Sequence, residues 1–416
     1  MFKTVRGTKD ILPQEAAIWQ KVENITREVF DLFGYEEIRI PIIEYKDLFL
    51  RSLGQENEIV QKQMFLVERE KETYALRPEG TASVARSYIE NNLANTKGFS
   101  KLFYIGPMFR AERPQKGRLR QFHHLGIEAI GSKSAYLDAE VIQLADFLLR
   151  KLGIDNFQIN LNSLGCKKDK EKLASIIKEQ LKDKLSDLCQ DCNRRYEQNV
   201  FRILDCKNPD CIKIKKSLNI KQQDYLCTDC LNYFHETLKA LDRENIKYNV
   251  DNFLVRGLDY YTGLVFEISQ DDLGAQDVIG AGGRYDNLIE ELGGKSVPAI
   301  GFAFGLERVL IALKNKNFSS SQMGVYVIFL DDNSRDKENT LICELRKHDI
   351  KCDTDFVGKS LKAALRKAND SGFRFVLLLG GDEIKNNTVT VKDMQQKSQV
   401  AVERKNIFSY LKGLIK

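Results

Sequence analysis

Two arginines stand in surroundings that would suit the binding of a phosphate group. Arg110 opens a stretch, residues 110–120, that holds five basic residues between two strand-like segments. Arg308 lies inside a predicted helix, residues 302–313, in which nine of twelve residues are apolar, so its guanidinium should be buried. A buried guanidinium needs an anionic partner, because desolvating an unpaired charge is costly. A ligand phosphate is one such partner. The alternative for Arg110 is that it lies at the solvent-exposed tip of a hairpin. The alternative for Arg308 is an ion pair with a carboxylate such as that of Glu307.

A strand-like segment, residues 122–131, places an imidazole and a carboxylate on the same face. With a period of two, His124, Gly126 and Glu128 point to one side of the strand. The glycine weakens packing but allows a ligand to approach the backbone closely. This face could bind a polar ligand, although a solvent-exposed polar face would show the same pattern.

A polar turn at residues 254–263 combines Arg256 and Asp259 with two adjacent tyrosines. A hairpin alone would account for Gly257 and Gly263. It would not account for paired tyrosines beside an arginine and an aspartate, so this turn is a second candidate for ligand contact.

Six of the nine cysteines fall within one short stretch and form three pairs, separated by 13 and 15 residues. The pairs are Cys189 and Cys192, Cys206 and Cys211, and Cys227 and Cys230. Any two pairs could supply four thiolates to Zn²⁺, and the outer two have the most typical spacing, so we predict zinc ligation by Cys189, Cys192, Cys227 and Cys230. The stretch is short and poor in apolar residues, so a metal could supply folding free energy. Reduced cysteines without a metal are the alternative.

The composition excludes several classes of protein. The 416 residues suffice for two or three domains, and 43% hydrophobic residues with 9% aromatics exclude a disordered or collagen-like chain. No apolar run approaches the ~20 residues that span a bilayer, and no secretory signal is recognisable. The net charge of +5 permits a nucleic-acid partner without requiring one. We expect a soluble, cytoplasmic protein with reduced cysteines and no membrane association.

The order of predicted elements indicates how these residues are positioned. An amphipathic helix at 14–34 precedes alternating strand and helix patterns, and strand patterns return at 249–256 after a lysine-rich and cysteine-rich region. Residues 314–322 have the composition of a linker, and alternating β and α patterns follow. The predicted domains are residues 1–162 with 241–318, an insertion at 163–240, and a compact α/β domain at 323–416.

Five segments together resemble the class II aminoacyl-tRNA synthetases, and the histidyl-tRNA synthetases among them. They are RPEGT at 77–81, FRAERPQKGRLRQFHHLGIEAIG at 109–131, LVRGLDYYTG at 254–263, GAGGRYD at 280–286 and GFAFGLERV at 301–309. The paired-tyrosine segment is specific to the histidine family and its paralogues, whereas the arginine segments mark class II enzymes generally. The resemblance implies an α+β fold: an antiparallel catalytic sheet flanked by helices, a helical cysteine-rich insertion and an α/β anticodon-binding domain.

The resemblance also implies an activity, namely ATP-dependent activation of L-histidine to histidyl-adenylate and transfer of the histidyl group to the 3' end of tRNA(His). The substrate carboxylate is already ionised at neutral pH, so the reaction requires cationic stabilisation of the transition state rather than a general base. By resemblance, Arg110, Arg256 and Arg308 are catalytic and, with Glu112, bind ATP, which Mg²⁺ accompanies. The residues implied for histidine binding are Glu79, Gly80, Thr81, His124, Glu128, Tyr260, Tyr261 and Tyr285.

One residue departs from the family pattern, in which the position of His124 is usually a glutamine that contacts the substrate. A neutral imidazole can replace the donor or the acceptor of that amide, but not both. Because histidine titrates near neutrality, substrate binding could become unusually dependent on pH.

Partners follow from the same resemblance. The segment around Pro41 corresponds to a dimer-forming motif, which implies a homodimer with two-fold symmetry. The insertion should lie near the transfer RNA acceptor stem, where the lysines of residues 167–184 and Lys213, Lys215, Lys216 and Lys221 could contact phosphates. A solvated helix face is the alternative for these lysines.

Two other functions are compatible with parts of the sequence. A non-catalytic, histidine-binding regulatory paralogue, the regulatory subunit of ATP phosphoribosyltransferase, shares the catalytic fold but typically lacks the anticodon-binding domain and the arginines that clamp ATP. A zinc-dependent nucleic-acid-binding protein would leave the arginine, glycine and tyrosine segments unexplained. Binding of ATP without nucleic acid would separate the latter from a synthetase.

Overall fold

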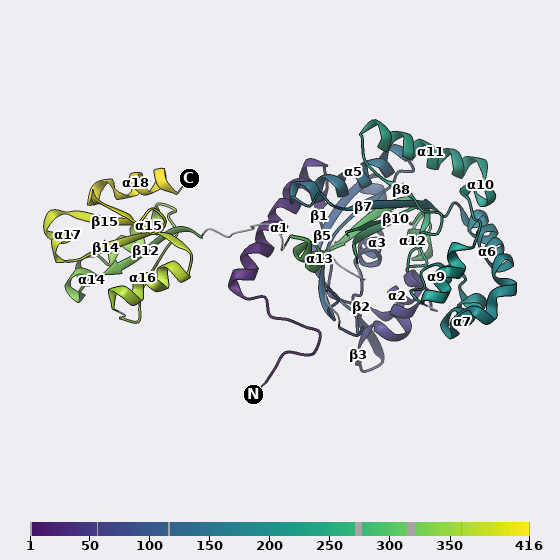
Figure 1. Ribbon diagram of the computed structural model, residues 1–416, viewed down its shortest axis with the longest axis horizontal. Coiled ribbons are helices and arrows are strands. Elements are labelled where there is room, and N and C mark those ends of the chain that lie inside the picture. Colours follow the sequence, from purple (N-terminus) through teal and green to yellow (C-terminus); the bar gives the residue numbers. More distant parts are fainter. Residues whose placement is uncertain are drawn as a thin grey trace. The chain divides into compact units, whose positions relative to one another are not determined.

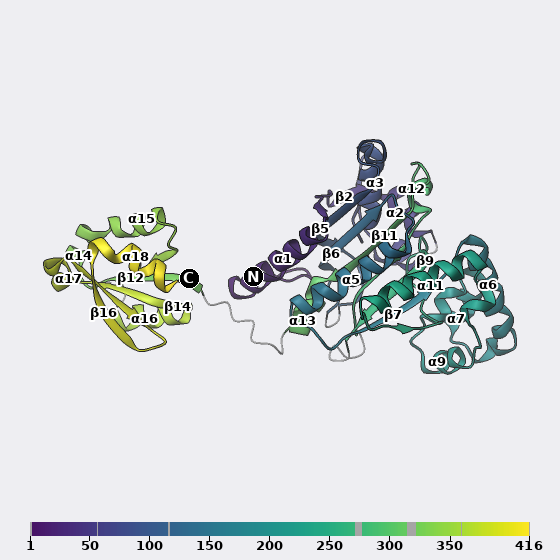
Figure 2. The same ribbon diagram turned by 90° about the horizontal axis from the view of Figure 1, so that it is seen from above.

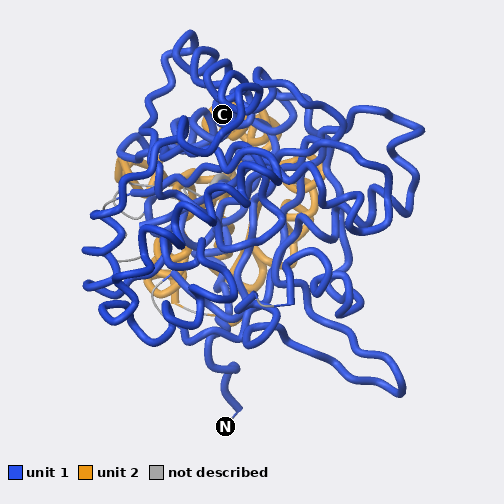
Figure 3. The backbone as a smooth tube through the Cα atoms, turned by 90° about the vertical axis from the view of Figure 1, so that its right-hand side faces the viewer, with its two compact units in different colours: residues 1–317 blue, residues 318–416 orange. Residues whose placement is uncertain are grey.

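The computed structural model describes residues 2–55, 57–114, 117–270, 277–313, 322–358 and 360–415. The chain divides into two compact units, residues 1–317 and 318–416, which Figure 3 shows in different colours. Most of the predicted linker, residues 314–321, lies outside the described residues. Within the described part of the chain, no helix combines the length and apolar character needed to span a membrane.

An eight-stranded sheet forms the centre of the first unit (Figure 1), in the order β1-β5-β6-β11-β10-β9-β7-β8. Neighbouring strands are antiparallel except for the two edge pairs, β1–β5 and β7–β8, which are parallel. The strands are β1 (Glu36–Glu37), β5 (Ser100–Phe109), β6 (Gln121–Ile130), β7 (Gln158–Ser163), β8 (Asn249–Val250), β9 (Thr262–Ser269), β10 (Val278–Arg284) and β11 (Ala299–Gly305). Because β11 pairs with β6, segments far apart in the sequence meet at the centre of the sheet.

Two groups of helices cover this sheet, on opposite sides of it (Figure 2). One group contains α1 (Pro13–Leu32), α5 (Ala135–Lys151) and α11 (Thr228–Arg243), and the other contains α2 (Lys46–Leu53), α3 (Thr81–Glu90) and α12 (Leu288–Glu291). Near the second group lie a three-stranded sheet of β2 (Ile43–Tyr45), β4 (Glu72–Leu76) and β3 (Phe65–Arg69), a π-helical turn (Ile59–Gln63) and α4 (Leu93–Thr96). Helix α1 confirms the amphipathic pattern, because Val22, Val29 and Phe30 are fully buried.

The predicted helix at 302–313 is wrong in its first third. Strand β11 runs to Gly305 and only then does α13 (Leu306–Leu313) begin. Residues 299–305 pair with β6. Phe302 and Phe304 point to one face of the sheet and are buried, while the small residues Gly301, Ala303 and Gly305 alternate with them on the other face. A continuous apolar run therefore does not distinguish a buried strand from a buried helix here.

The predicted strand at 249–256 is also wrong beyond its first two residues. Only β8 pairs, and the chain then leaves the sheet as a loop. The buried side-chain amide of Asn162 donates to the carbonyl oxygens of Asn252 (3.3 Å) and Leu254 (3.0 Å). These hydrogen bonds replace the backbone hydrogen bonds that a neighbouring strand would make. Arg256 therefore lies in a loop that the Asn162 side chain holds in place, and not in a strand.

The insertion is a layer of short helices whose buried residues join the apolar cluster of the first unit. Its helices are α6 (Lys167–Leu181), a 3₁₀ turn (Lys182–Asp187), α7 (Gln190–Gln198), α8 (Phe201–Leu204), α9 (Pro209–Lys216) and α10 (Gln222–Tyr225). Leu173, Ile177, Leu181 and Tyr225 are at most 1% exposed and belong to the apolar cluster that also surrounds the central cavity. The insertion therefore contains buried apolar residues, and the contribution of a metal to its folding stays a prediction.

The second unit is an α/β domain around a five-stranded sheet of order β13-β12-β14-β15-β16. Strands β12 (Gln322–Phe329), β13 (Cys352–Thr354) and β14 (Phe373–Leu379) are parallel, while β15 (Thr388–Asp393) and β16 (Ser398–Glu403) form an antiparallel hairpin. The helices are α14 (Asp332–Glu338), α15 (Thr340–Lys347), α16 (Leu361–Asp370), α17 (Gly381–Asn386) and α18 (Ile407–Leu414). Separate apolar clusters cover the two faces of the sheet.

Candidate active site

A cavity of about 550 Å³ lies over five consecutive strands of the large sheet, β5, β6, β11, β10 and β9. It is closed by the loop that carries Arg256 and by the end of α8. Ten of the twelve residues predicted for ATP and histidine line it: Glu79, Thr81, Arg110, Glu112, His124, Arg256, Tyr260, Tyr261, Tyr285 and Arg308. The other two, Gly80 and Glu128, lie directly behind this lining.

At one end of the cavity, Glu79 caps the start of α3. Its carboxylate accepts hydrogen bonds from the backbone N–H groups of Thr81 (2.6 Å) and Ala82 (2.9 Å), with Gly80 at the N-cap position. These donors would otherwise lack partners in the first turn of the helix. Burial raises the pKa of Glu79, against the opposing effect of these hydrogen bonds. The helix terminus thus holds an acidic group against the cavity.

Glu128 is the second buried acid of the site, at 1% exposure. One carboxylate oxygen accepts a hydrogen bond from the Thr81 hydroxyl (2.7 Å), and the other accepts one from the Tyr285 hydroxyl. Burial raises the pKa of Glu128 to about 8. The alternative of a solvent-exposed polar face is therefore wrong for Glu128, and contact of this residue with histidine stays a prediction.

Tyr104 on β5 is a site residue that sequence reasoning missed. It is buried, lines the cavity and directs its hydroxyl toward Glu128 at 3.4 Å. An ideal Cβ at Gly80 or at Gly126 would lie 2.3 Å from the Cζ atom of this ring. Gly126 therefore makes room for Tyr104 and not for a ligand, which corrects the expectation from the sequence. The cross-strand pairing of Tyr104 with Gly126 would have identified it, but that register is not visible in a local pattern.

We expect Gly126→Ala to lower both stability and activity. The added methyl group collides with the Tyr104 ring, and overpacking of this kind costs about 1–3 kcal/mol. Thermal unfolding measures the loss, with Gly381→Ala as the control, because an added Cβ at Gly381 meets nothing within 4 Å. Equal unfolding temperatures for the two variants would contradict the packing role of Gly126.

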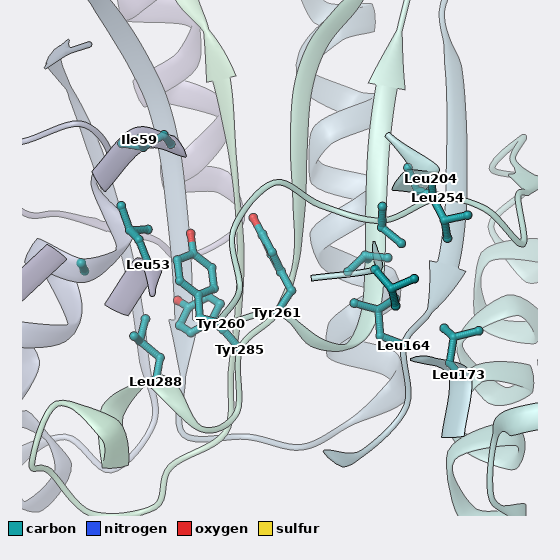
Figure 4. Packing of buried hydrophobic residues seen from close by; sticks show 14 of the residues in the cluster. Leu53, Ile59, Leu164, Leu173, Leu204, Leu254, Tyr260, Tyr261, Tyr285 and Leu288 are labelled. Atoms are coloured by element: carbon teal, nitrogen blue, oxygen red, sulfur yellow. The ribbon is translucent and has the colours of Figure 1, made fainter. Parts of the chain in front are cut away.

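Three tyrosines form the aromatic wall of the cavity. Figure 4 shows Tyr260, Tyr261 and Tyr285 side by side, between Leu53 and Leu288 on one side and further leucines on the other. The ring centroids of Tyr260 lie 4.8 Å from Tyr261 and 5.7 Å from Tyr285. Burial raises the pKa of all three, so their hydroxyls stay protonated and can donate hydrogen bonds. A flat, polar-edged ring fits such a wall.

The three arginines line the same cavity, and each is held by contacts of its own. Arg110 donates from Nε to the carbonyl oxygen of Pro78 (2.9 Å) and stacks over Phe122 at 5.3 Å. Arg256 forms an ion pair with Glu267, while its buried Nε has no partner among the described residues. A buried N–H without a partner is rare, and a ligand oxygen would satisfy it.

Arg308 is fixed by backbone oxygens. It donates to the carbonyl groups of Gly117 (3.2 Å) and Val278. Glu307, the carboxylate considered as its partner, is used elsewhere: it accepts hydrogen bonds from the backbone N–H of His123 at 3.0 Å. Burial and the nearby Arg118 lower the pKa of Arg308.

His124 lies on the cavity wall with its Nδ1 atom buried and without a partner among the described residues. Burial, together with Arg110 and Arg77, lowers the pKa of His124 to about 3. The imidazole is therefore neutral between pH 6 and 8, which contradicts the expectation that this residue makes substrate binding unusually pH-dependent.

We expect wild type and His124→Gln to show parallel pH profiles. Neither side chain changes charge between pH 6 and 8, so the dissociation constant for histidine should follow the titration of the substrate alike in both proteins. Calorimetric titration at four pH values in this range measures it. A change in the ratio of the two constants by more than about threefold would show that His124 titrates.

The predicted zinc ligand set is wrong in its pairing. The structure places Cys189 and Cys192 with the middle pair, and it places Cys227 and Cys230 with two residues at the start of α6. Sequence spacing alone could not show this, because the outer pairs begin different helices, α7 and α11.

Sequence reasoning also missed the contribution of the insertion to the cavity. Arg202, Asp205 and Lys207, at the end of α8 and just beyond it, line it from that side. Lys170 of α6, counted among the lysines available for phosphates, instead donates from Nζ to the backbone oxygen of Tyr261 (2.9 Å). Lys170 therefore helps to hold the backbone at Tyr261 in place and is not an exposed basic group.

An antiparallel sheet under a cavity that is lined by three arginines, acidic groups and tyrosines, together with a separate α/β unit, defines a class II aminoacyl-tRNA synthetase. A family model described as histidyl-tRNA synthetase matches residues 7–309, and one described as an anticodon binding domain matches residues 324–414. The chain belongs to the histidyl-tRNA synthetase family. The predicted fold class is confirmed, with an antiparallel sheet whose edge pairs are parallel.

Individual relatives agree with this assignment. The histidine–tRNA ligase of Thermosipho melanesiensis is 44% identical over 97% of both chains, and that of Halothermothrix orenii is 41% identical over 99% of both. Apo histidyl-tRNA synthetase of S. aureus has a similar structure, with a TM-score of 0.82 and 30% identity, over 99% of this chain and 100% of that one.

Proposed function

We propose that the protein is a histidine–tRNA ligase that acts in translation. It activates L-histidine with ATP to histidyl-adenylate and transfers the histidyl group to tRNA(His). The observation that carries this proposal is the single cavity in which three arginines face two buried acids and three tyrosines. An anionic substrate and a cationic, aromatic one would meet there.

The arrangement suits adenylate formation by positioning and charge. The histidine carboxylate attacks the α-phosphate and pyrophosphate leaves, so negative charge crowds at one point of the cavity. Arg110 and Arg256 would stabilise that charge, and the buried Nε of Arg256, which has no partner among the described residues, could donate to it. Arg308 would hold the outer phosphates. Mg²⁺ would accompany ATP as part of the substrate, and Glu112 on the cavity wall offers the oxygen ligands that it prefers.

Selectivity for histidine would come from the acidic and aromatic end. Glu79 and Thr81 would hold the ammonium group, and Glu128 with Tyr260, Tyr261 and Tyr285 would surround the imidazole. A side chain without ring nitrogens would leave these buried polar groups unpaired, which costs far more than a lost methylene contact.

The proposal extends to partners, domains and location. A homodimer is supported by exposed apolar residues on the small sheet, where Ile43, Tyr45 and Leu66 are 44–60% exposed. Residues 1–162 with 241–318 would be catalytic, 163–240 an insertion near the acceptor stem, and 323–416 the anticodon-binding domain. A cytoplasmic location agrees with nine free thiols. Zn²⁺ in the insertion would be structural, because none of the described cysteines lines the cavity.

Histidine-dependent exchange between ATP and labelled pyrophosphate tests the function. Exchange with histidine and not with the other amino acids would support the activation step and the pocket. Binding of histidine without exchange would favour the regulatory paralogue, against which the presence of the three arginines and of the second unit already argues.

A further inference from the structure

Four cysteines of the insertion converge on one point. The Sγ atoms of Cys189, Cys192, Cys206 and Cys211 all lie within 4.8 Å of one another, and those of Cys189 and Cys206 are 3.9 Å apart. All four are free thiols, at distances well beyond a disulfide bond of about 2.05 Å. Zinc bound tetrahedrally at about 2.3 Å from each sulfur would require sulfur atoms roughly 3.8 Å apart. The cluster therefore has the dimensions of a four-thiolate site.

The local backbone supports negatively charged sulfur at this cluster. Cys189 is the N-cap of α7, and Cys211 lies in the first turn of α9, where helix dipoles stabilise a thiolate. The backbone N–H of Cys189 donates to Sγ of Cys211 (3.3 Å), and that of Asn208 donates to Sγ of Cys206 (3.5 Å). Such outer hydrogen bonds orient the ligands of a metal site and offset their charge.

A second cluster joins the two ends of the insertion. Ligand atoms of Cys166, Asp169, Cys227 and Cys230 also lie within 4.8 Å of one another. Cys166 is the N-cap of α6 and Cys227 is the N-cap of α11, so two helix N-termini meet there. Asp169 is 3% exposed and accepts hydrogen bonds from the backbone N–H groups of Cys166 (3.1 Å) and Cys227 (3.0 Å). The carboxylate is thus held at the point where the three sulfurs converge.

We propose that the insertion binds two structural Zn²⁺ ions, one through Cys189, Cys192, Cys206 and Cys211 and the other through Cys166, Cys227, Cys230 and Asp169. Soft thiolates favour zinc over magnesium or calcium, and closed sets of four ligands are typical of structural rather than catalytic zinc. The inference goes beyond the proposed ligase activity, since neither ion touches the cavity. It replaces the ligand set predicted from spacing, which combined one pair from each cluster.

The first ion has a consequence for the active site. Cys206 lies between Asp205 and Lys207, and both of these line the cavity. A metal that fixes Cys206 would therefore hold this border of the cavity in place. Because the insertion has a core of buried leucines and isoleucines, loss of the metal should loosen this segment without unfolding the whole unit.

Metal analysis of the full chain, purified without added metal or chelator, tests the proposal. We expect about two zinc ions per chain for wild type, and about one for Cys206→Ser and for Cys227→Ser. Cys343→Ser is the matched control, because this exposed cysteine lies in the second unit and outside both clusters. Fewer than about 0.3 zinc per chain in wild type, iron in place of zinc, or an unchanged zinc content in either cluster variant would overturn the assignment.

A second measurement keeps the test decisive if a serine variant fails to fold. Wild-type protein is stripped with a chelator and titrated with Co²⁺, whose absorption reports on thiolate ligands and tetrahedral geometry. Thiolate-to-cobalt bands that saturate at about two equivalents support the two sites, and saturation at one, or no bands, contradicts them. Neither readout depends on catalysis, so a failed pyrophosphate exchange would not be mistaken for a failed metal site.

Discussion

Arg256→Ala is expected to reduce histidine-dependent pyrophosphate exchange by on the order of 10³-fold. Removing one preorganised donor to a transition-state oxyanion costs about 10²–10³ in rate, and here a full cation is lost as well. The unpaired Nε of Arg256 points to an acceptor that arrives with the substrate. Its other contact, the ion pair with Glu267, holds the guanidinium in place.

Two further variants separate chemistry from folding. Arg256→Lys keeps the positive charge but loses the planar fork, and it should recover only part of the lost rate. Arg366→Ala removes an exposed arginine of the second unit, 84% accessible at its side chain, and should exchange pyrophosphate as wild type does. A folded Arg256→Ala protein with more than about a tenth of the wild-type rate would contradict a direct role in the transition state.

The elements with a regular period were predictable from the sequence. Helix α1 follows the spacing of its apolar residues because it buries a single face. Strand β6 has the predicted alternation of residue types, although both of its faces are buried from Leu125 to Ile130. The failures occur where a segment is apolar on both faces or where pairing is non-local. Residues 302–305 are apolar on both faces and read as helix, and the loop after β8 is held by the side chain of Asn162 from another strand.

The candidate site was predictable mainly through family resemblance. Local reasoning identified Arg110, Arg256 and Arg308 as unusual cations, but not that they share one cavity, since that depends on the order of strands in the sheet. Tyr104 could not be predicted from its own segment, because its place in the site depends on its cross-strand pairing with Gly126. The pairing of cysteines was equally hidden, as helix packing decides which half-sites meet.

The behaviour of Glu128 links the stability of the fold to the demands of the site. Its pKa is about 8 in the folded protein, against an ordinary value of 4.5, chiefly because of burial. Between these two pH values the folded state binds more protons than the unfolded state, so the contribution of this group to stability falls as pH rises. The fall is at most roughly 1.4 kcal/mol per pH unit across that window and ends above the folded pKa.

We therefore expect Glu128→Gln to be more resistant to unfolding than wild type at pH 8, with a smaller difference at pH 5. A glutamine keeps the hydrogen-bond geometry toward Tyr285 and Thr81 but cannot ionise, so it avoids the cost of a buried carboxylate. Thermal unfolding at both pH values measures this, with Glu236→Gln on the exposed face of α11 as the control. A variant less stable than wild type at pH 8 would contradict the assignment of a raised pKa.

The same substitution should also lower the catalytic efficiency with histidine. The imidazole and ammonium groups of histidine are donors, and a carboxylate can accept from them with a charge that an amide lacks. A hydrogen bond donated by the bound histidine would lower the pKa of Glu128 and favour its ionised form. The interaction with histidine would then offset the cost of burying a charged carboxylate, and it would do so only in the complex. We expect a loss of at least about 100-fold in kcat/KM for histidine in pyrophosphate exchange. A stabilised variant with nearly wild-type kcat/KM would show that Glu128 is a structural acid that histidine does not contact.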